Sequence, residues 1–263
     1  MIKIFRKIRL GLLEEDSSAG RLGKLGKYLI YAIGEIVLVV IGILIALQLN
    51  NRNERISTYK KQENHLLLIK GEMINNIKTI DEISEALMTI IESSRTIINL
   101  MASDEDLNNI NEDELSGLIV QPLSREIKIY YENGALTELI SSGGLKDIRN
   151  DSIRSILASW ESKLTIVRLQ EKALREALVK SNYYMQLHGS YRTVFDGIEY
   201  SDDLKINRSS NNNSNKGLMK SQEFENILLN YLAVADHLHQ RVYPNFKDEL
   251  QSLIDLIDNE LNL

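Results

Sequence analysis

The feature that most constrains this chain is an uninterrupted apolar run near its N-terminus. Residues 28–49 read YLIYAIGEIVLVVIGILIALQL and carry a single charged residue, Glu35. As a helix the run would be about 33 Å long, which matches a hydrocarbon core of about 30 Å. Its 14 Leu, Ile and Val residues would favour insertion by about 4 to 8 kcal/mol, whereas a central acid costs about 3 kcal/mol. The run therefore predicts a transmembrane helix.

The charges on either side of this run predict its orientation. Residues 1–27 contain seven basic and three acidic residues, and basic flanks stay in the cytoplasm. Four basic residues between 52 and 61 weaken this bias without reversing it. We therefore expect a single-pass protein of the inner (cytoplasmic) membrane, with a cytoplasmic N-terminus and with residues 50–263 in the periplasm. A cleaved signal peptide is the alternative, but the apolar run is too long and no small-x-small cleavage pattern follows it.

The basic segment 1–27 is also amphipathic. Residues 2–13 read IKIFRKIRLGLL, and a helix would place Ile4, Phe5, Ile8 and Leu12 on one face with Lys and Arg on the other. Such a helix can lie in the membrane interface with its basic face toward anionic lipid. An ordinary positive flank of the span explains the same pattern, so both interpretations stay open.

Glu35 is the most specific candidate for a functional residue in the span. Steps of three and four residues place Ala32, Glu35, Val39, Gly42 and Ala46 on one helix face. Acids inside a membrane seldom face lipid, and small residues four apart let two helix backbones approach. We therefore predict a homo-oligomer in which several Glu35 side chains meet, some protonated and hydrogen-bonded across the interface. A proton or cation pathway, or a contact with another membrane protein, is the alternative.

Two stretches carry a resemblance to a known family. FRKIR (5–9) and GKYLIYAIGEIVLVVIGILIALQLNN (26–51) resemble an uncharacterised group of single-span membrane proteins of Bacteroidota, a domain of unknown function. A second patch, 132–157, is similar to that family's weaker mid-chain pattern. Arg52 stands where the family usually has Trp, and Gly143-Gly144-Leu145 replaces its usual S-G-N-L. The resemblance implies a membrane location in a bacterial envelope, and it implies no activity.

The remaining residues, 50–263, are predicted to form an all-α bundle. Apolar residues recur at steps of three and four over 56–101, 151–187 and 222–261, which is the pattern of helices packed on one broad face. The first of these helices is expected to continue directly from the span. No stretch alternates convincingly with period two. The pattern predicts three or four main helices in an extracytoplasmic bundle.

Polar and helix-breaking residues predict the connections between these helices. We expect a turn over the acidic residues 104–113, a short helix up to Pro122 and another over roughly 134–142. Residues 201–220 are rich in Asn and Ser and predict a mobile loop. Pro244 is expected to kink or break the last helix. Glu171 interrupts the apolar stripe of the second long helix, and we interpret it as a paired or rim charge.

Little in the chain predicts catalysis. The absence of Cys excludes disulfides, thiolate zinc sites and Cys nucleophiles, and no metalloprotease, nucleophile-elbow, Walker or dinucleotide motif occurs. His237 and His239 are two residues apart, so on a helix they point in different directions. A net charge of −6 disfavours nucleic-acid binding. We therefore expect no enzyme activity, no catalytic, metal or cofactor site, and no nucleic-acid partner.

One aromatic cluster is a candidate for recognition. It lies near the end of the second long helix and comprises Tyr183, Tyr184, Tyr191, Arg192 and Tyr200. Tyr and Arg are enriched where proteins bind ligands or partners. The alternative is a bundle end that is capped by tyrosines.

Three functions remain open on the sequence. The first, which we favour, is a membrane-anchored scaffold or interaction protein that self-associates through its span and binds an unknown envelope protein. The second is a sensor-like bundle that recognises a ligand and signals through a partner, because residues 1–27 are too few for an output domain. The third is an ion-coupled or proton-conducting oligomer that uses Glu35.

Overall fold

The structure is a computed structural model that describes residues 21–211 and 213–263. The expected interfacial helix at 2–13 lies outside these residues. The chain divides into two compact units, Met1–Lys61 and Gln62–Leu263. Each unit is considered by itself below.

The first unit contains the apolar run. Helix α2 extends from Arg21 to Met101, so the expectation that one helix continues from the run is confirmed. Among the described residues, one helix, Ala32–Met101, is long and apolar enough to cross a membrane. None of its most apolar 18-residue window is buried within the chain.

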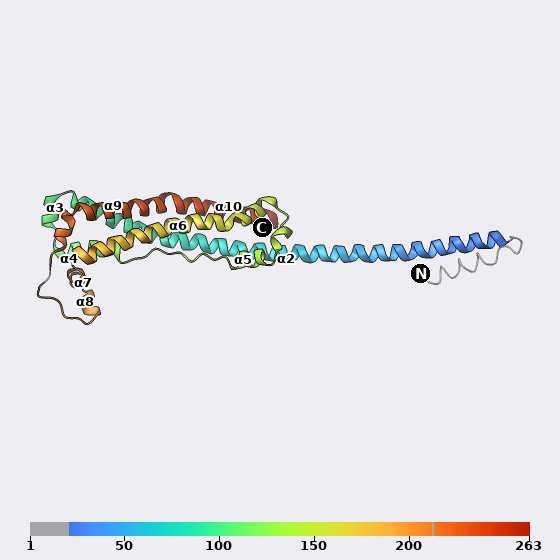
Figure 1. Cartoon of the computed structure of the whole chain (residues 1–263), viewed down its shortest axis with the longest axis horizontal. Helices are drawn as coiled ribbons and strands as arrows, with labels where there is room; N and C mark the ends of the chain where they lie inside the picture. The colour runs from blue at the N-terminus through green and yellow to red at the C-terminus, as the bar shows by residue number, and fades with distance from the viewer. Residues whose placement is uncertain (1–20, 212) are drawn as a thin grey trace. The chain divides into compact units, whose positions relative to one another are not determined.

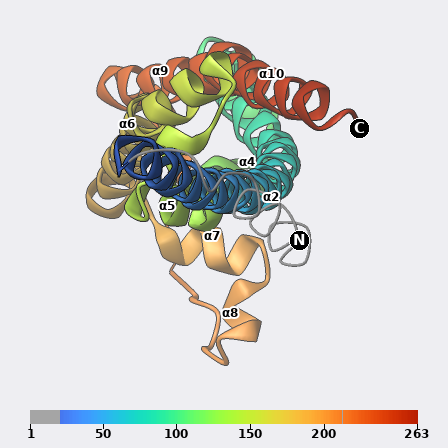
Figure 2. The same ribbon diagram turned by 90° about the vertical axis from the view of Figure 1, so that its right-hand side faces the viewer.

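The second unit is a helical bundle, which confirms the all-α prediction. Long helices α2, α6 (Asp151–His188), α9 (Gln222–His237) and α10 (Tyr243–Leu261) run side by side, as Figures 1 and 2 show. The described residues contain no β-strand. The shorter elements are α3 (Asp104–Asn109), α4 (Glu112–Leu123), α5 (Gly134–Ser141), η1 (Gly144–Asp147), α7 (Tyr191–Gly197), α8 (Tyr200–Asp203), η2 (Asn215–Lys220) and η3 (Leu238–Val242).

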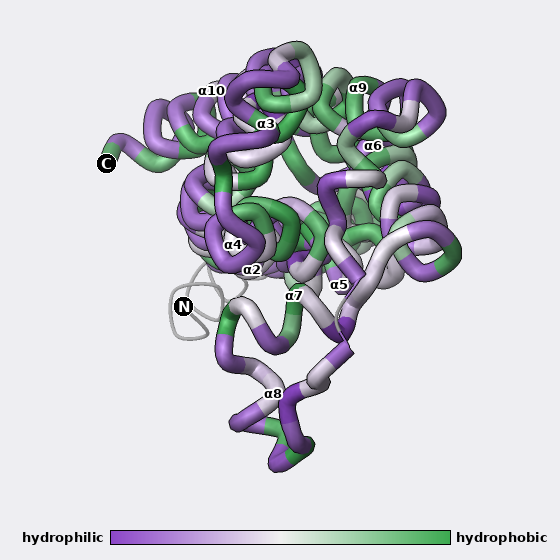
Figure 3. The backbone as a smooth tube through the Cα atoms, turned by 90° about the vertical axis from the view of Figure 1, so that its left-hand side faces the viewer, coloured by the Kyte–Doolittle hydropathy of each residue, from purple (hydrophilic) through white to green (hydrophobic). Residues whose placement is uncertain are grey.

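The core of the bundle is built from the predicted apolar stripes. Figure 3 shows hydrophobic and hydrophilic stretches alternating along the helices. The buried hydrophobic residues form one cluster. Trp160 of α6 lies at its centre, with its ring 5.6 Å from that of Phe246 of α10. Fully buried members of the stripes include Leu66, Met73, Ile80, Leu87, Ile153, Leu157, Leu164, Phe224, Leu228, Leu250 and Ile257.

The acidic segment 104–113 is not the turn that we expected. Residues Asp104–Asn109 form helix α3, and the Ser103 hydroxyl accepts a hydrogen bond from the backbone N–H of Asp106 at 3.2 Å. Three acids occupy the first turn of α3, where they interact favourably with the helix dipole. The next helix, α4, begins in the same way, with Asn111 as its cap. The acids that suggested a turn are therefore helix-start residues.

The connection between α4 and α5 is an extended segment. Residues 124–133 contain no helix and run along the bundle, and this segment is here called the strap. Ile127, Ile129 and Tyr131 are buried, whereas Lys128 and Tyr130 are exposed. This is a period-two alternation. It is only five residues long and lies among charged residues, so it did not stand out in the sequence.

The region 201–220 is less of a loop than expected. It begins within α8 and ends with the 3₁₀ helix η2, in which Asn215, Leu218 and Met219 are buried. The Asn215 side chain accepts from the Ser190 N–H at 2.7 Å and donates to the Ser190 carbonyl at 3.1 Å. Figure 2 shows α7 and α8 together at one side of the bundle. Among the described residues of the region, 204–211, 213 and 214 contain no helix.

Pro244 does not break the last helix. Helix α9 passes into the π-helical segment η3, and Pro244 is near the first position of α10. A proline has no N–H to donate, and a widened turn before it relieves the clash with the preceding carbonyl. Residues 222–261 therefore stay helical throughout, as predicted.

Candidate functional site

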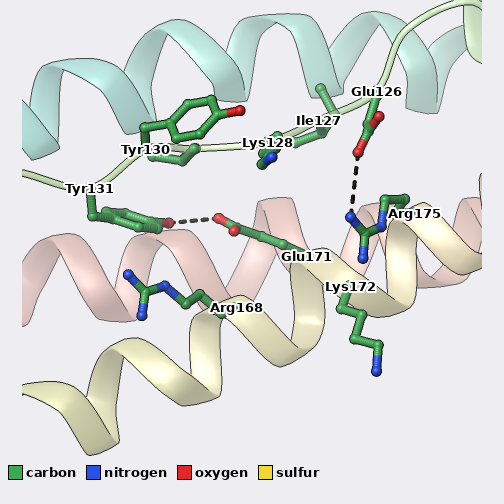
Figure 4. A pocket seen from close by; sticks show the side chains of 10 residues that line it. Glu126, Ile127, Lys128, Tyr130, Tyr131, Arg168, Glu171, Lys172 and Arg175 are labelled. Atoms are coloured by element: carbon green, nitrogen blue, oxygen red, sulfur yellow. Dashed lines mark hydrogen bonds and ion pairs between the residues drawn. The ribbon is translucent and has the colours of Figure 1, made fainter.

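The strap lies along the bundle between α2 and α6, with α10 behind it (Figure 4). Its N-terminal end is held by side chains that bond the last carbonyls of α4. The Tyr231 hydroxyl donates to the Pro122 carbonyl at 2.9 Å, and the Asn182 amide donates to the Leu123 carbonyl at 3.0 Å. These carbonyls have no partner within the helix.

The C-terminal end of the strap is held by α2. Asn76 donates to the Glu132 carbonyl at 2.9 Å and accepts from the Glu132 N–H at 2.8 Å. Glu72 accepts from the N–H of Ala135 at 2.6 Å and from that of Leu136 at 3.4 Å. Asn133, at the cap position of α5, makes no such bond with its side chain. A carboxylate on another helix therefore caps α5.

A cleft of about 320 Å³ opens between the strap and α6. Its walls are residues 126–131 of the strap and, on α6, Arg168, Glu171, Lys172 and Arg175. The α6 residues are three or four apart, so they share one face of the helix. The volume lies at the lower end of the range for small-molecule sites.

Glu171 is buried beside this cleft with only 8% of its surface exposed. The hydroxyls of Tyr131 and Tyr243 donate to its Oε1 atom at 2.7 and 3.2 Å. Burial raises the pKa of the Glu171 carboxyl, and the two hydrogen bonds and the charge of Arg168 oppose that rise. Burial and the nearby carboxylate both raise the phenol pKa values of Tyr131 and Tyr243, so both hydroxyls stay protonated as donors.

Four cations surround the mouth of the cleft. Arg168 forms an ion pair with Glu161 at 3.1 Å, and Arg175 forms one with Glu126 at 3.8 Å. Lys172 points away from the strap in Figure 4 and pairs with Glu176 at 3.7 Å.

Lys128 differs from the other three cations. Its ammonium lies 4.7 Å from the centre of the Tyr130 ring. Among the described residues, no carboxylate lies within ion-pair distance of Lys128. The cleft therefore presents cationic donors over a buried carboxyl group.

Our interpretation of Glu171 was only half correct. The residue is paired, but its partners are two hydroxyls. It is buried and does not lie at the rim of the bundle. In the sequence, the one sign of this buried acid is that it interrupts an apolar stripe. Tyr131 and Tyr243 lie 40 and 72 residues from Glu171, so no spacing rule could predict that they meet at its carboxyl group.

Three members of the predicted recognition cluster are engaged in hydrogen bonds. Tyr184 bonds Ser221 at 2.7 Å, and Tyr191 bonds the Asn182 side chain at 3.0 Å. The Arg192 guanidinium donates to the Asn207 carbonyl. These three side chains tie the end of the bundle together.

The two other members of that cluster are left exposed. Tyr183 is 61% exposed and Tyr200 is 42% exposed. The ring of Tyr200 meets that of Phe195 edge-on at 5.0 Å. They remain available for contacts, but they lie apart from the cleft lining.

The predicted membrane face is open along α2. Ala32, Glu35, Gly42 and Ala46 are all exposed. A Cβ atom placed on Gly42 would meet no other atom of the chain within 4 Å. The face can therefore accept the backbone of another helix without rearrangement of this chain.

The histidines and the acids form no metal site among the described residues. His237 is exposed and His239 is half-buried, with its Nδ1 atom 3.1 Å from the Gln240 amide. In the part of the chain that the structure describes, no group of three His, Asp or Glu side chains is placed to hold an ion.

Comparisons with known proteins do not assign the chain to a family. No protein-family model, curated protein or solved structure matches it. The resemblance found in the sequence therefore stays a prediction, and the function has to be argued from the geometry of the chain itself.

Proposed function

We propose that this protein is a membrane-anchored interaction protein of the bacterial envelope that self-associates through its span. Residues 28–49 would cross the inner membrane with the N-terminus in the cytoplasm, and the bundle would stand in the periplasm and bind an envelope protein. One observation carries the proposal: the most apolar 18 residues of α2 are not buried by any of the residues that the structure describes. Lipid is the natural cover for such a surface.

The face of this helix that carries Glu35 suits lipid least, and it supports self-association. Glu35 is a charged residue in an otherwise apolar window, and burying it against another helix avoids exposing it to hydrocarbon. Gly42 and Ala46 share that face and allow close helix contact. A second copy of the chain supplies the same small residues, so a symmetric pair is self-complementary.

The test is the number of subunits in nanodiscs, measured by native mass spectrometry. We expect a defined oligomer for the wild type and its loss in Gly42→Leu, because the larger side chain blocks the close approach of two backbones. Gly34→Leu is the matched control, since Gly34 lies on a different face of the same helix and is equally open. A monomeric wild type, or equal effects of both variants, would contradict the proposal.

Glu35→Gln distinguishes this function from an ion-coupled oligomer. Gln keeps a hydrogen-bonding side chain of the same size but cannot carry a proton. A structural contact predicts a changed oligomer and no change in membrane conductance. An ion pathway predicts an intact oligomer with altered proton or cation flux in proteoliposomes.

The cleft beside the strap favours a second function, ligand binding by the bundle. A cavity of about 320 Å³ with cationic donors and a buried carboxyl is the kind of site that binds a small polar molecule. In that function, a partner protein would carry the signal. Ligand binding is compatible with self-association through the span.

A further inference from the structure

We propose that the cleft between the strap and α6 binds a small organic acid with a hydrogen-bond donor beside its carboxylate, that is, an amino acid or a hydroxy acid. This inference rests on the ligand-binding function proposed above and is independent of self-association. It follows from two groups of atoms that face the same cleft from different elements.

The carboxylate of the ligand would bind the cations. Lys128 comes from the strap and Arg168 and Arg175 come from α6, about two helical turns apart. In Figure 4 Lys128 lies between the two arginines along the cleft. Each guanidinium carries several N–H donors and uses some of them in its ion pair, so donors remain for an anion.

Lys128 is the strongest of these candidates for contact with an anion. It carries a full charge, is exposed, and has no carboxylate partner in the described chain. The strap places it over α6 because its neighbours Ile127 and Ile129 are buried on the opposite side. The alternation of the strap therefore delivers a cation to the cleft.

The donor of the ligand would bind Glu171. Both hydrogen bonds that Glu171 receives from the described residues end on Oε1. Its second oxygen, Oε2, is thus open to a further donor at the cleft wall. An amino or hydroxyl group of a ligand would donate to this oxygen and form a charge-assisted hydrogen bond.

The two requirements together define the class of ligand. Acetate or propionate satisfies the cations but carries no donor for Glu171, and a simple amine satisfies Glu171 but is repelled by the cations. A carboxylate with an adjacent amino or hydroxyl group satisfies both. Such molecules are also small enough for a cavity of about 320 Å³.

The experiment is isothermal titration calorimetry on the full chain in nanodiscs. The probes are the individual amino acids, glycolate, lactate and malate, with acetate, propionate and inorganic phosphate for comparison. We expect at least one amino or hydroxy acid to bind more tightly than acetate, propionate and phosphate. Lys128→Ala and Arg175→Ala should each weaken that binding about tenfold or more, because a charge-assisted hydrogen bond is lost. Lys180→Ala, an exposed cation on α6 outside the cleft lining, is the matched control and should bind like the wild type.

Glu171→Gln tests the donor requirement directly. The Gln carbonyl can still accept from the two tyrosines, but its amide would then face the cleft as a donor. We expect the amino or hydroxy acid to bind about tenfold more weakly and any weak binding of propionate to stay unchanged.

Three results would overturn the inference. In the first, phosphate or propionate binds as tightly as the best amino or hydroxy acid, and Arg175→Ala abolishes that binding. This result would reject the proposed class of ligand but would leave the ligand-binding function in place. Unchanged binding in both cation variants or in Glu171→Gln would place the ligand elsewhere. No binding by any probe at millimolar concentration would reject the inference together with the ligand-binding function, and the proposed oligomer would be unaffected.

Discussion

At the residue scale, Glu171 is the side chain with the most unusual surroundings in the described chain. It is an acid within the apolar stripe of α6, and two tyrosine hydroxyls from different elements converge on one of its oxygens. Burial disfavours the ionised form and raises its pKa. The residue therefore makes the stability of the bundle depend on pH.

The direction of that dependence follows from the raised pKa. The folded state holds the Glu171 proton to a higher pH than the unfolded state, so the free energy of unfolding falls as pH rises from the unfolded pKa through the folded one. One group changes the slope by at most about 1.4 kcal/mol per pH unit. We expect Glu171→Gln to gain stability relative to the wild type as the pH rises above about 4.5, measured by urea unfolding. Parallel curves for the two proteins would show that Glu171 is not responsible.

Two adjacent tyrosines of the strap differ in their contacts, because Tyr131 bonds Glu171 and Tyr130 is exposed. Tyr131→Phe removes the 2.7 Å hydrogen bond to Glu171 and leaves the buried carboxyl with one donor. The expected loss is about 1 to 3 kcal/mol in the free energy of unfolding. Tyr130→Phe is the control, because Tyr130 is 77% exposed, and it should change stability by less than about 0.5 kcal/mol. Equal effects in chemical denaturation would mean that the Glu171 bond contributes nothing.

At the scale of the elements, contacts between helices decide where the short helices begin and end. Glu72 of α2 caps α5, and Tyr231 of α9 bonds a terminal carbonyl of α4. Close packing also fixes the distance between α7 and α4. A Cβ on Gly197, at the end of α7, would lie 2.8 Å from the Ser116 hydroxyl and 3.2 Å from the Asp113 backbone. The lack of a side chain at Gly197 therefore sets the distance between the two helices.

Two glycine substitutions test this packing and should have opposite effects. Gly197→Ala should destabilise the bundle by about 1 to 3 kcal/mol, because α7 must move away from α4. Gly117→Ala, inside α4, meets no atom within 4 Å and should stabilise the protein by about 0.5 to 1 kcal/mol through its helix propensity. Thermal unfolding followed by circular dichroism measures both. A neutral Gly197→Ala would show that the α4–α7 contact is loose.

At the scale of the whole molecule, the bundle and the apolar run are built on different principles. Every residue of the buried hydrophobic cluster lies at or after Leu66, within the unit Gln62–Leu263. The apolar window of the first unit contributes nothing to that core. The bundle thus has a hydrophobic core of its own, and burial of that core favours its folding in water.

This separation predicts the behaviour of a truncated chain. Residues 62–263 should be soluble without detergent and unfold cooperatively, with a midpoint temperature within about 5 °C of the bundle transition of the full chain. Size-exclusion chromatography and calorimetry measure both properties. Aggregation, or the loss of a cooperative transition, would mean that the first 61 residues are needed for the core.

The helical class, the helix long and apolar enough for a membrane, and most of the core were predictable from the amino-acid pattern alone. These properties depend on periodicity and hydropathy along the chain, and the stripes that include Leu66, Trp160 and Phe224 are buried as their spacing predicts. The strap, the cap that Glu72 places on α5 and the contacts of Tyr131 and Tyr243 with Glu171 became visible only in the packed bundle. These contacts join residues 40 to 72 positions apart, and they depend on how each helix is rotated about its axis when the bundle packs. Spacing along one helix carries no information about that rotation, so the cleft could not be predicted before the fold was known.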